Sequence, residues 1–127
     1  MGFMKTRSAK NKGMRLQKLV GQMIADAIGE KFGYGENVRS AFSSEVGRDI
    51  VLTGSALEKY PFSVECKNQE KWNIGAYIAQ AAKNRQMGTE YQVIISKNNF
   101  EPHVIMRLDA FLEFWKIYLL TEEVRNG

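Results

Sequence analysis

Three side chains with complementary chemistry, Asp49, Glu65 and Lys67, stand out by their types and their spacing. Residues 47–52 and residues 61–68 are rich in β-branched and aromatic residues and are bounded by Gly, Ser and Pro, so each segment is predicted to form a short strand. Side chains two positions apart on a strand share a face, which places Glu65 and Lys67 together. Pairing of the two strands in a hairpin would bring Asp49 beside them.

Two carboxylates and an ammonium group in one place have a chemical use. Paired carboxylates repel each other unless a cation neutralises them, and hard oxygen ligands favour Mg²⁺ or Mn²⁺. A bound metal lowers the pKa of a coordinated water, and a lysine beside it can orient that water or stabilise charge on a phosphate. The alternative interpretation is a solvated charge pair on an exposed strand, because Glu-x-Lys alone is a frequent pattern.

The arrangement of Asp49 followed, after a connecting segment, by Glu65-x-Lys67 resembles the signature of the PD-(D/E)XK nuclease superfamily. The flanking residues 47–50 (Gly-Arg-Asp-Ile) and 64–68 (Val-Glu-Cys-Lys-Asn) look like the Holliday-junction-resolvase branch, which includes small phage-encoded relatives. Both the motif and its strand context therefore favour a nuclease over a solvated charge pair.

One position departs from the family pattern. Arg48 stands where the family name has proline, but this position varies among relatives. The resemblance covers roughly residues 13–108 and implies an α/β fold with a restriction-endonuclease-like αβββαβ core, in which helices flank a small mixed sheet.

The resemblance implies a metal-dependent DNA endonuclease and assigns a role to each residue of the motif. Asp49 and Glu65 would hold Mg²⁺ (or Mn²⁺), helped by the backbone carbonyl of Cys66. Lys67 would position or activate the attacking water. Gln80, on the helix predicted after the Glu-x-Lys strand, matches a glutamine that often points into the site in relatives.

Gln17 is a second amide with a possible role at the site. It borders the apolar stripe of the first predicted helix, where many resolvase-like relatives carry a carboxylate. An amide cannot supply a charged ligand, so any second metal would bind weakly there. Gln17 can instead hydrogen-bond a metal-bound water or a phosphate, or it is simply a polar residue beside the core.

The distribution of charge predicts a polyanionic partner. The 127 residues carry a net charge of +4 with a pI near 9.2, and residues 1–15 contain five basic residues and no acid. We expect residues 1–12 to form a flexible basic arm and residues 13–127 to form a single nuclease domain. Solvated charge is the alternative for each candidate DNA contact. The candidates are Lys5, Arg7, Lys10, Lys12, Arg15, Gln17, Arg39, Arg48, Lys83 and Arg85.

Composition excludes several other classes of protein. A single cysteine and a single histidine exclude a disulfide framework and a dedicated zinc site. Cys66 is interpreted as a small buried hydrophobe behind the catalytic strand. The sequence shows no long apolar run and no secretory h-region, so we expect no membrane partner and a cytoplasmic location, the host cytoplasm for a phage-encoded protein.

The remaining elements follow from periodicity and from turn residues. A last helix, starting after Asp109, is aromatic, and its apolar residues are predicted either to pack in the core or to form a dimer face. The connection 53–60 is predicted to be a turn or short loop. The other predicted elements are a helix over 14–31, a strand over 38–42, a helix over 74–87 and strands over 91–96 and 103–108.

These patterns predict an endonuclease that cuts branched or four-way DNA as a homodimer. A non-cleaving nucleic-acid-binding module of the same fold is the alternative, although such a module has no need for two repelling carboxylates. A protein-interaction domain would leave the basic N-terminal segment without a purpose. Cleavage with and without magnesium distinguishes these classes.

Overall fold

The computed structural model describes residues 2–127, with side chains from residue 8 onward. One five-stranded mixed sheet in the order β1-β2-β3-β4-β5 forms the centre of the molecule. β3 and β4 are parallel, and the other neighbouring strands are antiparallel. The α/β prediction of a small mixed sheet flanked by helices is confirmed. The strands are β1 (Val38–Ser40), β2 (Ile50–Leu52), β3 (Phe62–Asn68), β4 (Glu90–Lys97) and β5 (Phe100–Ile105).

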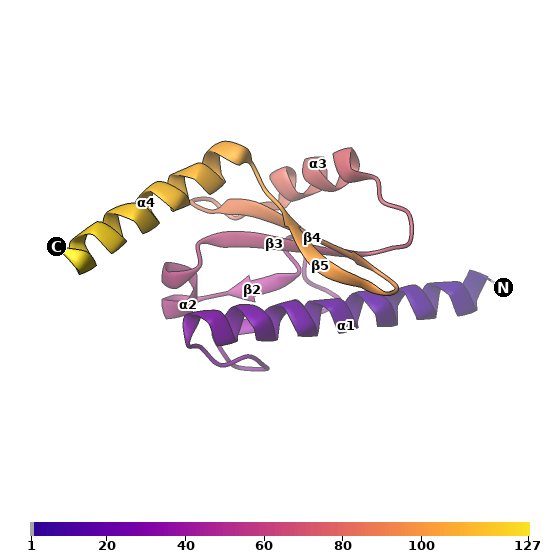
Figure 1. Cartoon of the computed structure of the whole chain (residues 1–127). Helices are drawn as coiled ribbons and strands as arrows, with labels where there is room; N and C mark the ends of the chain where they lie inside the picture. The colour runs from indigo at the N-terminus through magenta and orange to yellow at the C-terminus, as the bar shows by residue number, and fades with distance from the viewer. Residues whose placement is uncertain (1) are drawn as a thin grey trace.

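Helices cover both faces of this sheet. α1 (Gly2–Ile28) lies along one face and α3 (Ile74–Asn84) lies on the other, where it connects β3 to the parallel β4 (Figure 1). α2 (Gly54–Lys59) is a short helix between β2 and β3. α4 (Leu108–Asn126) extends away from the sheet at the C-terminal end (Figure 1). No helix among the described residues has the length and apolar character needed to cross a membrane.

α1 is held on the sheet by the apolar stripe seen in the sequence. Leu16, Val20 and Ile24 are buried in one cluster with side chains of β1, β2, β3 and β4. Each buried aliphatic side chain contributes about 1.5–3 kcal/mol through removal of its surface from water. Gly29, with φ of +72°, ends the helix by adopting a left-handed conformation that favours glycine.

The start of α1 differs from the prediction. The helix begins at Gly2, whereas a helix was expected from Met14. The flexible arm over residues 1–12 stays a prediction. Residues 2–13 contain no proline and include Ala, Met, Lys and Arg, which favour helix, so the helix extends backwards from its packed part. The predicted DNA contacts Lys5 and Arg7 lie outside the residues with described side chains.

The hairpin that carries the motif forms as predicted, but its connection does not. β2 and β3 pair antiparallel, with Ile50 opposite Val64. The turn or short loop expected between them is replaced by α2, whose Ala56 is fully buried in the α1-side cluster. Burial of this side chain explains why the segment folds into a helical turn on the core instead of forming an exposed loop.

α4 does not pack in the core of the monomer. None of its residues is buried, and Trp115 and Leu120 keep 51% and 61% of their surface exposed. Phe114 alone of its aromatic rings stacks on a core ring, with its centroid 4.9 Å from that of Phe62. Apolar residues occur around the whole helix instead of along one stripe, so no single face of α4 matches the core. The prediction of core packing is therefore wrong.

Candidate active site

Asp49 is fixed in place by backbone and side-chain hydrogen bonds from two neighbouring segments. Its amide donates to the carbonyl of Val64 (2.8 Å), and its carbonyl accepts from the amide of Ala41 (2.8 Å). Its Oδ2 accepts from the amide of Cys66 at 2.7 Å. The carboxylate therefore lies against β3, at the level of Glu65, as the hairpin predicted.

Glu65 is a buried carboxyl group in the middle of the sheet. The residue is 3% exposed, and its Oε1 is buried without a hydrogen-bond partner. Burial, the charge of Asp49 and a hydrogen bond with Asp49 raise the pKa of Glu65 to about 7, while Lys67 acts in the opposite direction. Two carboxyl groups thus share a site where ionisation of both is costly unless a cation is present.

Lys67 lies on the same face of β3 as Glu65, as the strand periodicity predicted. Its Nζ is 5.4 Å from the centroid of the Tyr77 ring, and Tyr77 is a buried residue of α3. The Tyr77 hydroxyl donates to the side chain of Gln69 and is thereby fixed. Attraction between the ammonium group and the ring face restricts Lys67 to the site side of the strand.

Cys66 faces away from this site. It is buried with Val64 and Phe62 in the cluster beneath α1. Burial and the nearby charges of Asp49 and Glu65 raise the pKa of the Cys66 thiol well above its ordinary value. The thiol is therefore an inert part of the core, which agrees with its interpretation as a buried hydrophobe.

The donor set fits one hard divalent cation. Two carboxyl groups adjoin each other, and the unpaired Oε1 of Glu65 offers a lone pair that no protein group uses. Within the described part of the chain, no cluster of three or more His, Cys, Asp or Glu side chains exists. Mg²⁺ takes one or two carboxylates and keeps several waters, so this sparse set suits it better than a zinc or calcium site.

α3 brings an amide to the site, one helical turn from the expected position. The side chain of Asn84 hydrogen-bonds Glu65 and favours its ionised form. Gln80, the predicted residue, lies four positions earlier on the same helix face and is exposed. The residue of this face that hydrogen-bonds Glu65 in the structure is Asn84, and the role of Gln80 stays a prediction. Gly47, with φ of +115°, lets the loop before Asp49 pass close to the Asn84 carbonyl.

The other predicted contact residues differ in exposure and in their hydrogen-bond partners. Gln17 is half-buried on α1, and no hydrogen bond joins it to the cluster among the described residues. Arg39 forms an ion pair with Glu45 (2.7 Å), and Arg85 donates to the carbonyl of Thr89 (2.8 Å). The exposed side chains are those of Lys10, Arg15, Lys83 and Arg85, whereas Lys12 and Arg48 are half-buried.

The raised pKa of Glu65 predicts how the stability of the metal-free protein depends on pH. Folding raises this pKa from 4.5 to about 7, so the folded state binds the proton more tightly than the unfolded chain. The resulting stabilisation is complete below pH 4.5 and is lost as the pH rises towards 7. In EDTA, the Tm of the wild-type protein should fall between pH 5 and pH 8 relative to that of Glu65→Gln. Parallel Tm profiles of the two proteins would contradict this prediction.

Comparison with known proteins places this geometry in a family. A family model described as "Phage putative PDDEXK endonuclease" matches residues 8–119, which is most of the chain. No curated protein and no solved structure matches the chain. The matched range contains Asp49, Glu65 and Lys67 together with the sheet and helices that position them. The chain therefore belongs to the family of phage PDDEXK endonucleases.

Proposed function

We propose that the protein is a Mg²⁺-dependent endonuclease that hydrolyses phosphodiester bonds in branched DNA. The observation that carries this proposal is the convergence of Asp49 and Glu65, two carboxyl groups with an unpaired buried oxygen, beside Lys67. Mg²⁺ (or Mn²⁺), when bound there, would supply an activated water and neutralise phosphate charge. Asp49 and Glu65 hold the cation, with the backbone carbonyl of Cys66 as a further ligand.

The protein groups around the cation have separate roles in this proposal. Lys67 orients the attacking water and stabilises the charge that develops on the phosphate. The bond from the Cys66 amide keeps the Asp49 carboxylate aligned with β3. The Asn84 amide hydrogen-bonds Glu65 and partly offsets the rise in its pKa. Gln80 and Gln17 lie further out and are proposed to contact the phosphate or its water.

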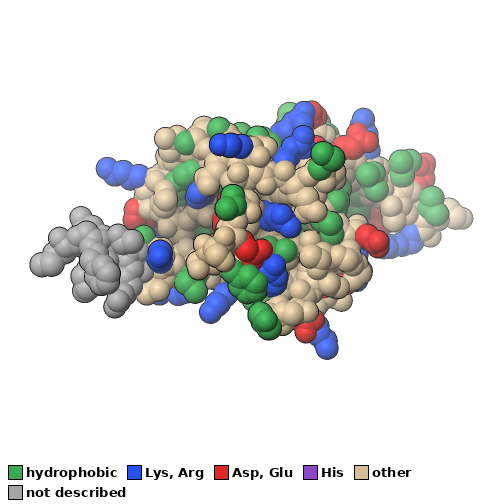
Figure 2. Space-filling view, turned by 180° about the vertical axis from the view of Figure 1, so that it is seen from behind, with side chains coloured by type: hydrophobic (Ala, Val, Ile, Leu, Met, Phe, Trp, Pro, Cys, Tyr) green, Lys and Arg blue, Asp and Glu red, His purple; other side chains and the backbone are tan. Residues whose placement is uncertain are grey.

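The DNA backbone is proposed to lie along basic residues near this centre. Figure 2 shows Lys and Arg side chains spread over the face that is seen from behind. Arg48 lies next to Asp49 in the chain, and Lys83 lies on α3. Phosphate contacts of this kind give affinity and position without reading sequence. Lys10 and Lys12, in the N-terminal part of α1, are proposed to extend this contact.

A homodimer is proposed because a four-way junction needs matched nicks on two strands. One chain holds a single carboxylate cluster, and a twofold dimer provides two identical sites in related positions. α4 leaves an apolar surface uncovered, and an apolar hollow of about 270 Å³ lies between α1 and β5, lined in part by Met23, Ile94 and Val104. Each chain thus offers both an uncovered apolar helix and an apolar hollow, which favours contact with a second copy.

Cleavage of defined DNA substrates tests the proposal. Labelled duplex, flap, single-stranded and four-way DNA of the same sequences should be incubated with the protein, with and without Mg²⁺. Cleavage is expected only with the metal, and the four-way DNA should be cut most readily. Metal-dependent cutting of linear duplex at the same rate would leave a general nuclease and exclude the junction preference. Binding without any cleavage would favour a DNA-binding module of the same fold.

A further inference from the structure

A small hollow with aromatic walls lies at the edge of the sheet beside the candidate active site. It has a volume of about 240 Å³ and is formed by the loop after α1, by β1 and by the first residues of loop 41–49. Its lining includes Phe32, Tyr34, Phe42, Ser40 and Lys18. The hollow is separate from the carboxylate cluster, and the active-site chemistry above does not use it.

The two outer rings of the hollow are exposed to solvent, and neither belongs to the buried core. Tyr34 keeps 89% of its surface exposed and Phe42 keeps 47%. Their ring centroids are 6.1 Å apart and the rings are inclined by 47°, so they flank the hollow as a pair. Exposed aromatic rings of this kind cost solubility, and they are a common platform on which nucleic acid bases stack.

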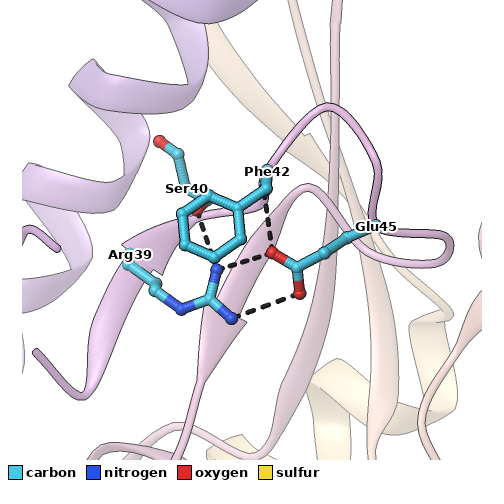
Figure 3. A network of polar contacts seen from close by, with 4 residues as sticks. All are labelled: Arg39, Ser40, Phe42 and Glu45. Atoms are coloured by element: carbon cyan, nitrogen blue, oxygen red, sulfur yellow. Dashed lines mark hydrogen bonds and ion pairs between the residues drawn. The ribbon is translucent and has the colours of Figure 1, made fainter. Parts of the chain in front are cut away.

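A polar network holds one of these rings in a fixed place. The Glu45 carboxylate accepts two hydrogen bonds from Arg39, of 2.7 and 3.2 Å, and a third from the Phe42 amide at 2.7 Å. Arg39 also donates to the Ser40 carbonyl and lies 4.5 Å from the centroid of the Phe42 ring (Figure 3). The ring is therefore presented by a braced loop, and little conformational entropy would be lost when a ligand stacks on it.

The polar part of the lining is basic, with Arg39 and Lys18 beside the rings. Lys18 adds a positive charge at the rim, and it forms no ion pair within the described part of the chain.

The hollow is connected directly to the catalytic hairpin. The Ala41 amide, in its lining, donates to the carbonyl of Asp49 at 2.8 Å. Neighbouring strands are about 4.8 Å apart, and a nucleotide advances a DNA strand by about 3.4 Å or more. One DNA strand could therefore place a phosphate at Asp49 and a base one or two nucleotides away in the hollow.

We propose that this hollow binds one unpaired nucleobase of the DNA strand that is cut, stacked against Phe42 and Tyr34. This rests on the proposed function, because it takes DNA to be the substrate. A base that is still paired in a duplex cannot enter, so the hollow selects DNA with an unpaired nucleotide next to the cut phosphate. It supplies a physical reason for a preference for branched DNA, where bases at the branch are unpaired.

Fluorescence of 2-aminopurine tests the base site without relying on cleavage. The analogue is placed at a single unpaired position of a flap and, as a control, at the same position of a full duplex. Glu65→Gln protein should quench it in the flap and leave the duplex signal unchanged. Phe42→Ala should weaken flap binding by about 10-fold, since stacking is worth about 1–3 kcal/mol per base. Phe42→Tyr, which keeps the ring, should bind as the parent does.

Tyr34→Ala provides a second and independent variant. Tyr34 is 89% exposed, so its truncation should leave the Tm unchanged, yet it should weaken binding of the flap. Equal flap affinity for Phe42→Ala and its parent, or equal quenching in flap and duplex, would overturn the base site. Metal-dependent cleavage with no effect of Phe42 would remove the base site but keep the nuclease. Quenching that is specific to the flap, in a wild-type protein that does not cleave DNA, would keep the base site and exclude the nuclease.

Discussion

Glu65→Gln should lower DNA cleavage by about 10²-fold or more, and Asp49→Asn and Lys67→Ala should have effects of similar size. Glutamine keeps the shape of the buried side chain but removes a negative ligand. Glu65 already has a pKa of about 7, so a neutral side chain is tolerated there and the protein should stay folded. Single-turnover cleavage at saturating DNA and Mg²⁺ measures the effect on chemistry alone.

Measurements of DNA binding distinguish a variant that has lost only the cleavage step from one that has also lost DNA affinity. Without metal, DNA affinity of Asp49→Asn and Glu65→Gln should hold or rise, because phosphate no longer meets a second negative charge. Glu58→Gln is a matched control, since Glu58 is an exposed carboxylate on α2, away from the cluster. It should cut as the wild type does. Undiminished cutting by Glu65→Gln would exclude the carboxylate cluster as the catalytic centre.

The arrangement of the motif could be predicted from local rules. The side-chain alternation of β3 places Glu65 and Lys67 on one face and Cys66 on the other, whatever the rest of the chain does. Ile50 and Val64 are both fully buried in the cluster under α1, and they lie opposite each other in the paired strands. Once that register is set, Asp49 must lie beside Glu65. The arrangement of these three side chains could therefore be predicted from two short segments of the sequence.

Contacts between segments that are distant in the sequence could not be predicted from such local rules. Gln80 and Asn84 share a helix face, and only the position of α3 along β3 decides which of them meets Glu65. α2 forms because Ala56 finds a buried place under α1, which local propensity does not reveal. The hollow at Tyr34 and Phe42 joins residues from α1, β1 and two loops, and no sequence spacing relates them.

α4 shows a further limit of pattern reading. Its aromatic density is typical of a core helix, and the sequence offered core packing or a dimer face as alternatives. The rings of Phe111, Trp115 and Tyr118 follow one another with centroids 6.3 and 5.3 Å apart, and each remains about half exposed. Exposure of a continuous aromatic row to water is unfavourable for a single chain. Of the two alternatives, the dimer face therefore stays the prediction for α4.

The area and charge of α4 suit a second copy of the chain. An aromatic side chain has about 150–250 Å² of surface, so the half-exposed row of Phe111, Trp115 and Tyr118 leaves on the order of 300 Å² for contact with a partner. α4 carries four acids and two bases, whereas α1 from residue 8 onward carries four bases and one acid. Packing of α4 of one copy near α1 and the β5 hollow of the other would join apolar and oppositely charged surfaces.

Trp115→Glu combined with Leu119→Glu should therefore convert a dimer into a monomer. Each buried hot-spot side chain is worth about 2 kcal/mol or more, so the double change should raise the dimer Kd by at least about 10²-fold. Light scattering should give the wild type twice the 14.5 kDa chain mass and the variant the single mass. Lys116→Glu changes charge on the same helix without removing apolar surface and should stay dimeric.

The monomeric variant separates assembly from chemistry. Its carboxylate cluster is intact, so it should still nick one strand with Mg²⁺, but the paired nicks that resolve a four-way junction should be lost because they require two sites in one complex. The products of one binding event distinguish these cases, since a dimer gives linear duplexes and a monomer gives a singly nicked junction. A wild-type protein that is monomeric at every concentration yet cuts both strands together would contradict the dimer.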